Sequence, residues 1–108
     1  MFIRLFVDAI DKEEAIKYSK NFECLIADSL IGLRLTKVEQ YWKIPELYCI
    51  EYGFKDFIPE KLPDVIKQIG NNPYIFSTGE KIKEYIFSKT PGEIYLDKID
   101  WLLINVEK

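Results

Sequence analysis

The chain contains no histidine, and this absence excludes several kinds of active site at once. Catalytic serine–histidine and cysteine–histidine pairs need an imidazole as the general base. Structural zinc sites need about four cysteine or histidine ligands at short spacings, whereas the two cysteines, Cys24 and Cys49, stand far apart in the chain. We therefore expect no metal and no cofactor, and we expect both thiols to be reduced and buried.

Glycine is also scarce, with five residues in a chain of 108. None of them belongs to a glycine-rich loop of the kind that binds the phosphates of a nucleotide. A carboxylate pair is the remaining catalytic option, because Glu39 and Glu51 can face each other across a hairpin and close carboxylates can carry out acid–base catalysis. A solvated strand surface explains these two acids better, so we predict that the protein is not an enzyme.

Long apolar runs and clusters of basic residues are missing as well. A membrane helix needs roughly 20 consecutive apolar residues, and the short N-terminal run MFIRLFV is followed at once by acids, without a cleavage site of small residues. The net charge is −3. Nucleic acids and anionic membranes are therefore not expected as partners, because both attract clustered Lys and Arg. These features predict a cytoplasmic protein that can bind a basic partner.

What the sequence does contain is enough apolar surface for one hydrophobic core. Hydrophobic residues make up 48% of the chain and charged residues 31%, which is typical of a globular domain. A length of 108 residues suits one domain and leaves little room for a second. We predict a single domain over residues 1–108.

Hydrophobic periodicity predicts an α+β fold. Asp11 and Glu14 have the spacing of a helix cap, and Pro45 marks the turn of a hairpin whose loop should hold three residues. Residues 80–88 fit either a helix or a strand, and we favour the helix slightly. The predicted elements are a strand at 2–7, a helix to about 29, hairpin strands at 34–43 and 47–54, a helix at 60–69, a short strand at 74–76 and one or two strands at 94–106.

This order is β-α-β-β-α-β with a C-terminal strand extension, and it resembles a ferredoxin-like sandwich with two helices on one face of an antiparallel sheet. One face of such a sheet is covered and the other is open. Alternation assigns to the covered face Ile3, Leu5, Val7, Val38, Trp42, Ile50, Tyr52 and Phe54. Unless residues 94–106 cover it, the open face presents Phe2, Arg4, Phe6, Lys37, Glu39, Tyr41, Cys49 and Glu51.

The segment Leu5–Ile10, LFVDAI, raises a nucleic-acid alternative. It resembles the first ribonucleoprotein motif of RNA-recognition domains, in which a strand aromatic stacks on a base. The matching segment on the third strand has Gly53 followed by Phe54, but Tyr52 replaces the leading basic residue and Asp56 stands at an expected aromatic position. Because no basic patch accompanies these residues, we do not expect RNA binding.

The open face and the hairpin turn combine aromatic side chains with carboxylates, which suits a basic protein partner. The predicted protein-binding residues are Arg4, Phe6, Glu39, Tyr41, Glu46 and Glu51. In size, acidity and surface type, the whole chain resembles the immunity proteins of bacterial toxin systems. The resemblance implies a noncatalytic protein that neutralises a cationic toxin domain, often a nuclease, with carboxylates that replace phosphates and steer association.

The predicted fold also leaves a second hypothesis open. Ferredoxin-like domains can act as regulatory or small-ligand-binding domains, since a fold alone does not determine a function. This hypothesis predicts a homodimer with a ligand pocket between the subunits and symmetric pairing of the edge strands.

Overall fold

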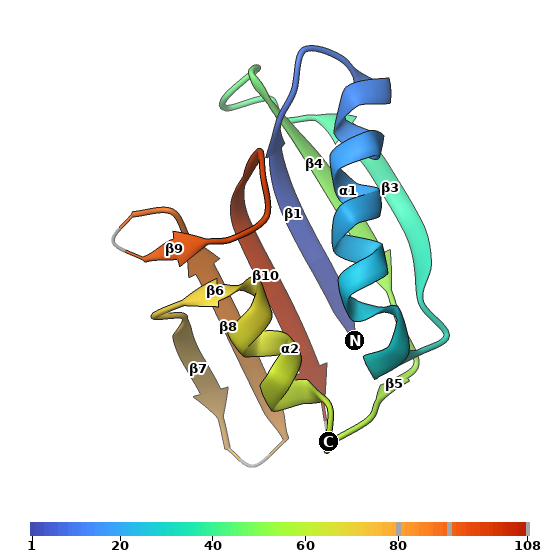
Figure 1. Ribbon diagram of the computed structural model, residues 1–108, viewed down its shortest axis with the longest axis vertical. Helices are drawn as coiled ribbons and strands as arrows, with labels where there is room; N and C mark the ends of the chain where they lie inside the picture. Colours follow the sequence, from blue (N-terminus) through green and yellow to red (C-terminus); the bar gives the residue numbers. More distant parts are fainter. Residues whose placement is uncertain (80, 91, 108) are drawn as a thin grey trace.

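The computed structural model describes residues 1–79, 81–90 and 92–107. Two helices lie on one face of a six-stranded antiparallel sheet with the strand order β3-β4-β1-β10-β8-β7 (Figure 1). Two short pairs, β2-β5 and β6-β9, join the loops. The elements are β1 (Phe2–Asp8), α1 (Lys12–Ile26), a 3₁₀ turn (Ala27–Ser29), β2 (Leu30–Ile31), β3 (Arg34–Gln40), β4 (Leu47–Gly53), β5 (Asp56–Phe57), α2 (Leu62–Ile69), β6 (Gly70–Asn71), β7 (Tyr74–Thr78), β8 (Ile82–Ser88), β9 (Glu93–Ile94) and β10 (Ile99–Glu107).

The first helix begins where its capping residues predict. The backbone N–H of Glu14 donates a hydrogen bond of 2.8 Å to Oδ1 of Asp11, and the backbone N–H of Ile10 donates one of 3.3 Å to Oε1 of Glu14. Both bonds satisfy backbone donors that a helix start leaves free. After the 3₁₀ turn the chain reverses at Gly32, whose φ of +71° suits a residue without a Cβ.

The second helix, α2, accommodates a proline. Pro63 stands in its first turn, where a backbone N–H has no partner within the helix, so the proline removes no helical hydrogen bond. Val65 and Ile69 of α2 are buried, and Ile69 points into the core. The helix predicted over residues 60–69 is therefore confirmed apart from its first two residues.

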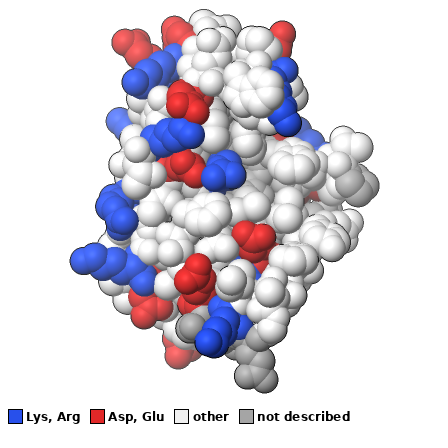
Figure 2. Space-filling view, turned by 180° about the vertical axis from the view of Figure 1, so that it is seen from behind, with Lys and Arg blue, Asp and Glu red and all other residues white. Residues whose placement is uncertain are grey.

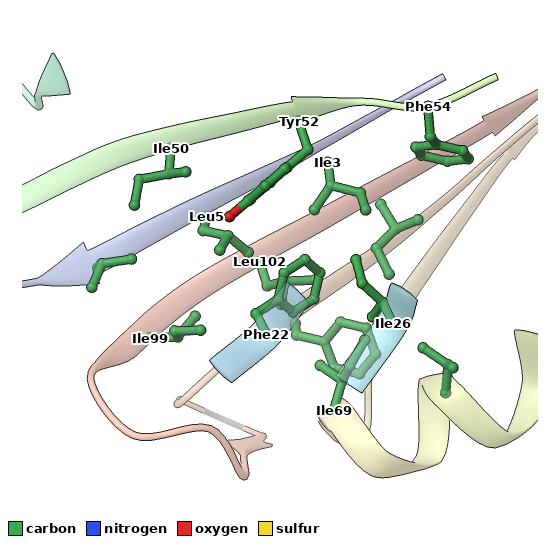
Figure 3. Packing of buried hydrophobic residues seen from close by; sticks show 14 of the residues in the cluster. Ile3, Leu5, Phe22, Ile26, Ile50, Tyr52, Phe54, Ile69, Ile99 and Leu102 are labelled. Carbon is green, nitrogen blue, oxygen red and sulfur yellow. The ribbon is translucent and has the colours of Figure 1, made fainter. Parts of the chain in front are cut away.

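The core lies between the helices and the sheet, where Phe22 of α1 and Ile69 of α2 meet strand residues such as Leu102 (Figure 3). The rings of Phe22 and Tyr52 have centroids 6.1 Å apart. Burying one such side chain stabilises the fold by about 1.5–3 kcal/mol. Six of the eight residues predicted for the covered face are buried, namely Ile3, Leu5, Val7, Ile50, Tyr52 and Phe54.

Two predictions about the hairpin are wrong. The strands β3 and β4 are separated by residues 41–46 rather than by three residues. Because β3 ends at Gln40, Trp42 lies in this loop, where the alternation of a strand no longer applies. Trp42 is therefore 79% exposed and does not belong to the core. Val38 is half-buried on the covered face, opposite Ile50.

The preference for a helix over residues 80–88 is also wrong. Residue 80 lies outside the described residues, and Ile82–Ser88 form the strand β8 between β10 and β7. In this position β8 pairs on both sides, and its Phe87 is completely buried. Pairing with β10 over its whole length and with β7 over residues 82–86 outweighs the helical spacing of a few apolar residues.

The ferredoxin-like β-α-β-β-α-β arrangement is not confirmed. The strand β8 stands between the predicted strand at 74–76 and the C-terminal strand, so β7, β8 and β10 follow α2 in the sheet, and β10 lies beside β1 (Figure 1). The C-terminal segment thus widens the sheet instead of crossing its open face. The face of the sheet opposite the helices is uncovered by any described element, and we call it the open face. Among the described residues, no helix is both long and apolar enough to cross a membrane.

Candidate functional site on the open sheet face

The open face has two parts of different chemistry. Figure 2 shows this face with many blue and red side chains on the side of β3, at the left of the view, and mostly white side chains at the right. The first part is an ion-pair ladder made by Arg4, Lys37, Glu39 and Glu51. The second is an aromatic cluster made by Phe6, Tyr41, Trp42 and Trp101 at one end of the sheet.

The ion-pair ladder crosses three neighbouring strands. Arg4 on β1 donates two hydrogen bonds to Oε1 of Glu51 on β4, 2.7 Å from Nη2 and 3.1 Å from Nε. Nζ of Lys37 on β3 lies 2.9 Å from Oε1 of Glu39 and 4.0 Å from Oε2 of Glu51. The hydrogen bond to Glu39 raises the pKa of Lys37, which keeps its ammonium charged. Two cations face two anions, so the ladder carries no net charge.

The neutral charge of the ladder affects two roles considered for Glu39 and Glu51, the steering of a basic partner and acid–base catalysis. Both carboxylates are engaged by cations of the same chain, so they do not form the surplus of negative charge that would steer a basic partner. The ammonium of Lys37 also bridges them. Acid–base catalysis by a carboxylate pair needs oxygens that are open to a substrate, whereas Arg4 and Lys37 already occupy both acids here.

The aromatic cluster is built from residues far apart in the sequence. The ring centroids of Phe6 on β1 and Tyr41 lie 4.9 Å apart with the planes at 61°, and Phe6 and Trp101 on β10 lie 6.4 Å apart at 79°. Tyr41 and Trp42 are 6.3 Å apart at 62°. These are edge-to-face contacts, which aromatic rings prefer. Tyr41 and Trp101 therefore contact Phe6 directly, and Trp42 is connected to it through Tyr41.

A shallow apolar hollow lies within this cluster. Its volume is about 210 Å³, and its lining comes from Phe6, Tyr41, Ile44, Leu47 and Trp101. Trp101 is 50% exposed and Ile44 47%. Beneath this part of the face, Cys49 lies opposite Phe6 in the register of β1 and β4, and burial raises the pKa of its thiol. The hollow is suited to an apolar or aromatic side chain of a partner.

The structure brings most of the predicted binding residues together. Arg4, Phe6, Glu39 and Glu51 lie on the open face, as their strand registers require, and Tyr41 follows β3 directly and joins the cluster. Glu46 is exposed in the 41–46 loop, where its carbonyl oxygen accepts a hydrogen bond of 3.3 Å from the N–H of Ala9. Their role in binding remains a prediction.

Sequence reasoning missed Trp101, and it placed Trp42 in the core. The segment Ile99–Val106 has buried Leu102 and Ile104 at alternate positions, and this alternation assigns Trp101 and Leu103 to the opposite face. The signal for an outward Trp101 was therefore present. Its proximity to Phe6 follows only from the pairing of β10 with β1, where the two residues are direct partners.

The cysteines do not behave as a pair. Cys49 is buried, but Cys24 on α1 is exposed, so the expectation of two buried thiols is wrong for Cys24. Its position on the solvent side of α1, between the buried Phe22 and Ile26, explains the exposure. Within the described residues, no group of three or more Cys, Asp or Glu side chains could hold a metal ion.

A larger hollow lies on the other side of the sheet, between α2 and the hairpin of β7 and β8. Its volume is about 670 Å³, and its lining combines apolar and basic side chains: Phe57, Leu62, Ser77, Gly79, Lys81, Ile82, Lys83, Tyr85 and Val106. Nζ of Lys83 lies 5.2 Å from the centre of the Tyr85 ring. Among its described residues, Lys81 and Lys83 supply cationic donors.

Comparisons with models of protein families, with curated proteins and with solved structures found no match to the chain. The assignment of a function therefore rests on the chemistry of these surfaces.

Proposed function

We propose that the protein is a noncatalytic protein-binding module and that it binds its partner through the aromatic cluster of the open face. One observation carries the proposal: four aromatic rings form a chain of edge-to-face contacts, and three of them, Phe6, Tyr41 and Trp101, line an apolar hollow on a sheet face that no described element covers. Aromatic residues are enriched at the centres of protein interfaces, where a few of them supply most of the binding energy. Contiguous exposed apolar surface on a soluble protein marks such sites.

The cluster is also held in place before binding. Phe6 and Trp101 project from neighbouring strands in the middle of the sheet, and the loop that holds Tyr41 is closed by a hydrogen bond of 2.8 Å from the N–H of Tyr41 to the carbonyl oxygen of Leu47. Rings that are already ordered lose little conformational entropy on binding. The preorganised rings therefore support the proposal that this end of the sheet binds a partner.

The most concrete form of this proposal is an immunity protein that binds and neutralises a cognate toxin domain by blocking its active site or substrate path. The small size and the net charge of −3 support it. Since the ion-pair ladder is neutral, the carboxylates available to a basic toxin are those beside the aromatic cluster. Asp8 and Glu46 are both exposed at this end, where Asp8 pairs with Leu47 in the register of β1 and β4.

The test is neutralisation of a toxin domain encoded beside the gene of this protein. The purified protein should form a stoichiometric complex with that domain and abolish its activity, and Phe6→Ala should weaken inhibition. Tyr95→Ala is a control at another aromatic residue, since Tyr95 is 56% exposed and contributes no ring to the cluster. The absence of any complex would exclude the immunity form, and equal inhibition by both variants would exclude the aromatic cluster as the binding surface.

The hollow on the helix side favours a second candidate, a domain that binds a small anionic ligand. A volume of about 670 Å³ lies in the range of ligand pockets, and Lys81 and Lys83 supply positive charge. A regulatory domain of this kind should melt at a higher temperature with an anionic metabolite, because a ligand that binds only the folded state stabilises it. Loss of that shift in Lys83→Gln would place the ligand in this hollow.

A further inference from the structure

The two edge strands of the six-stranded sheet differ in how well they are protected against pairing with another chain. The edge strand β3 contains Arg34, Lys37 and Glu39, and its register with β4 shifts between Leu35 and Lys37. The opposite edge strand, β7, has the sequence YIFST, without charge or proline, and pairs with β8 without interruption over all five residues. Charges, prolines and bulges are the usual means by which proteins prevent an edge strand from pairing with another chain, and β7 has none of them.

The unprotected edge is also accessible. All five residues of β7 are exposed, among them Tyr74 at 65%, Ile75 at 50% and Phe76 at 44%. Only β8 pairs with β7 in the described part of the chain, so the other side of the strand presents backbone N–H and C=O groups without a protein partner. Tyr, Ile, Phe and Thr are residues that favour strands. β7 is therefore an extended, neutral segment that is ready to pair.

We propose that β7 pairs with β7 of a second copy of this chain, antiparallel and about a twofold axis, so that the two sheets become one. All neighbouring strands of the six-stranded sheet are already antiparallel, and a twofold axis necessarily pairs a strand with itself in that direction. The register centred on Phe76 pairs all five residues. It places Phe76 opposite Phe76, Ile75 opposite Ser77 and Tyr74 opposite Thr78.

Charge indicates which of the two edge strands can pair with the same strand of a second copy. In the same symmetric arrangement β3 would place Lys37 opposite Lys37 of the second copy, because Lys37 is the middle residue of Arg34–Gln40. Like charges that face each other across a strand pair are destabilising. β7 brings no charges together and adds an aromatic cross-strand pair at its centre. The chain is thus compatible with itself at β7 and not at β3.

The surface beside β7 continues this neutral character. On the open face Tyr74 is paired with Ile86, and both line a hollow of about 510 Å³ together with Trp101. Glu84, which is paired with Phe76, has Oε2 only 3.1 Å from Nδ2 of the buried Asn105. The acid nearest the centre of β7 is therefore tied toward β10 instead of toward the edge. In the dimer the apolar surfaces of both copies would meet across the shared strand pair.

The proposal goes beyond the aromatic cluster and is tested by the oligomeric state of the purified protein, measured by sedimentation over a range of concentrations. The wild type should form a dimer. Ile75→Lys with Ser77→Lys places lysines opposite each other twice and should raise the dimer dissociation constant at least tenfold. Ile75→Lys with Ser77→Glu should restore the dimer, because the lysine introduced at position 75 then faces the glutamate introduced at position 77 of the second copy.

Two controls separate the interface from the fold. Circular dichroism and thermal melting of the double variants should match the wild type, since both positions are exposed. Trp42→Lys, also at an exposed position, should leave the dimer intact. A wild type that stays monomeric at every concentration would overturn the proposal. So would a lysine pair that leaves dimerisation unchanged, or a lysine–glutamate combination that dimerises no better than the lysine pair.

Discussion

Arg4 and Glu51 are joined by two hydrogen bonds, of 2.7 Å and 3.1 Å, between neighbouring strands of the open face. The same carboxylate lies 4.0 Å from Lys37, which in turn holds Glu39. The acids that the sequence suggests as a surface for a basic partner are therefore already balanced by two cations. We therefore propose that binding at this face depends on the aromatic cluster and on the carboxylates beside it.

Reversing the charge of the ladder should slow association with a basic partner. Glu39→Lys with Glu51→Lys changes a neutral group of four side chains into four cations beside the aromatic cluster. At low ionic strength the association rate constant should fall about tenfold, and the difference should shrink as salt is added. Stopped-flow kinetics at several salt concentrations measure this effect. An unchanged association rate would show that the partner does not approach this face.

The buried hydroxyl of Tyr52 should contribute to the stability of the folded protein. It donates a hydrogen bond of 2.7 Å to Oε1 of Glu23, and Tyr52 as a whole is 1% exposed. Removing the hydroxyl in Tyr52→Phe should lower the free energy of unfolding by about 1 kcal/mol at neutral pH. Urea denaturation measures this change.

The difference between wild type and Tyr52→Phe should depend on pH above 10. Burial, followed by the hydrogen bond to Glu23, raises the pKa of Tyr52 above its ordinary value of 10.0. The folded protein therefore holds this proton more tightly than the unfolded chain. The stabilisation is complete below pH 10 and declines as the pH rises further, because only the unfolded state then ionises. A difference that stays constant from pH 9 to pH 11.5 would contradict the buried, hydrogen-bonded hydroxyl.

The two cysteines should react at different rates with a thiol reagent. Cys24 is exposed, whereas Cys49 is buried and burial raises the pKa of its thiol, which lowers its thiolate fraction. Under native conditions one thiol per chain should be modified, and the second should react only in denaturant. Mass spectrometry identifies the site, and Cys24→Ser should leave the native protein unmodified. Equal reactivity of both thiols would contradict the burial of Cys49.

Substitutions of Phe22 and Trp42 should differ strongly in their effect on the stability of the protein. Phe22 is completely buried, so Phe22→Ala should lower the free energy of unfolding by about 3–5 kcal/mol. Trp42 is 79% exposed, and Trp42→Ala should change that free energy by no more than about 0.5 kcal/mol. Chemical denaturation of both variants checks the comparison. A large loss of stability in Trp42→Ala would contradict the exposed position of Trp42 and indicate that it is buried in the core.

Local features of the sequence predict a large part of this fold. The alternation in β1 assigns Ile3, Leu5 and Val7 to the core, and Asp11 marks the start of α1 through its side-chain hydrogen bond. Each of these signals depends on residues a few positions apart. The predicted binding residues Arg4, Phe6, Glu39 and Glu51 also reach the open face for this reason, since alternation within a strand determines the face.

The features that sequence reasoning missed depend on contacts between distant segments. The strand state of β8 results from pairing with β10 and β7 on either side. The contact between Phe6 and Trp101 exists because β10 pairs with β1 in the middle of the sheet, and periodicity carries no information about which strands are neighbours. The pairing of Glu51 with both Arg4 and Lys37 likewise depends on the register of three strands.

The affinity for the proposed toxin partner, measured by titration calorimetry with the wild type and with Trp101→Ala, tests the central claim most directly. Trp101 forms part of both the aromatic cluster and its hollow, so the dissociation constant should rise at least tenfold, which corresponds to about 1.4 kcal/mol of binding free energy. Tyr95→Ala should bind as tightly as the wild type. A Trp101→Ala variant that is folded and binds with unchanged affinity would contradict the claim that the aromatic cluster is the binding surface.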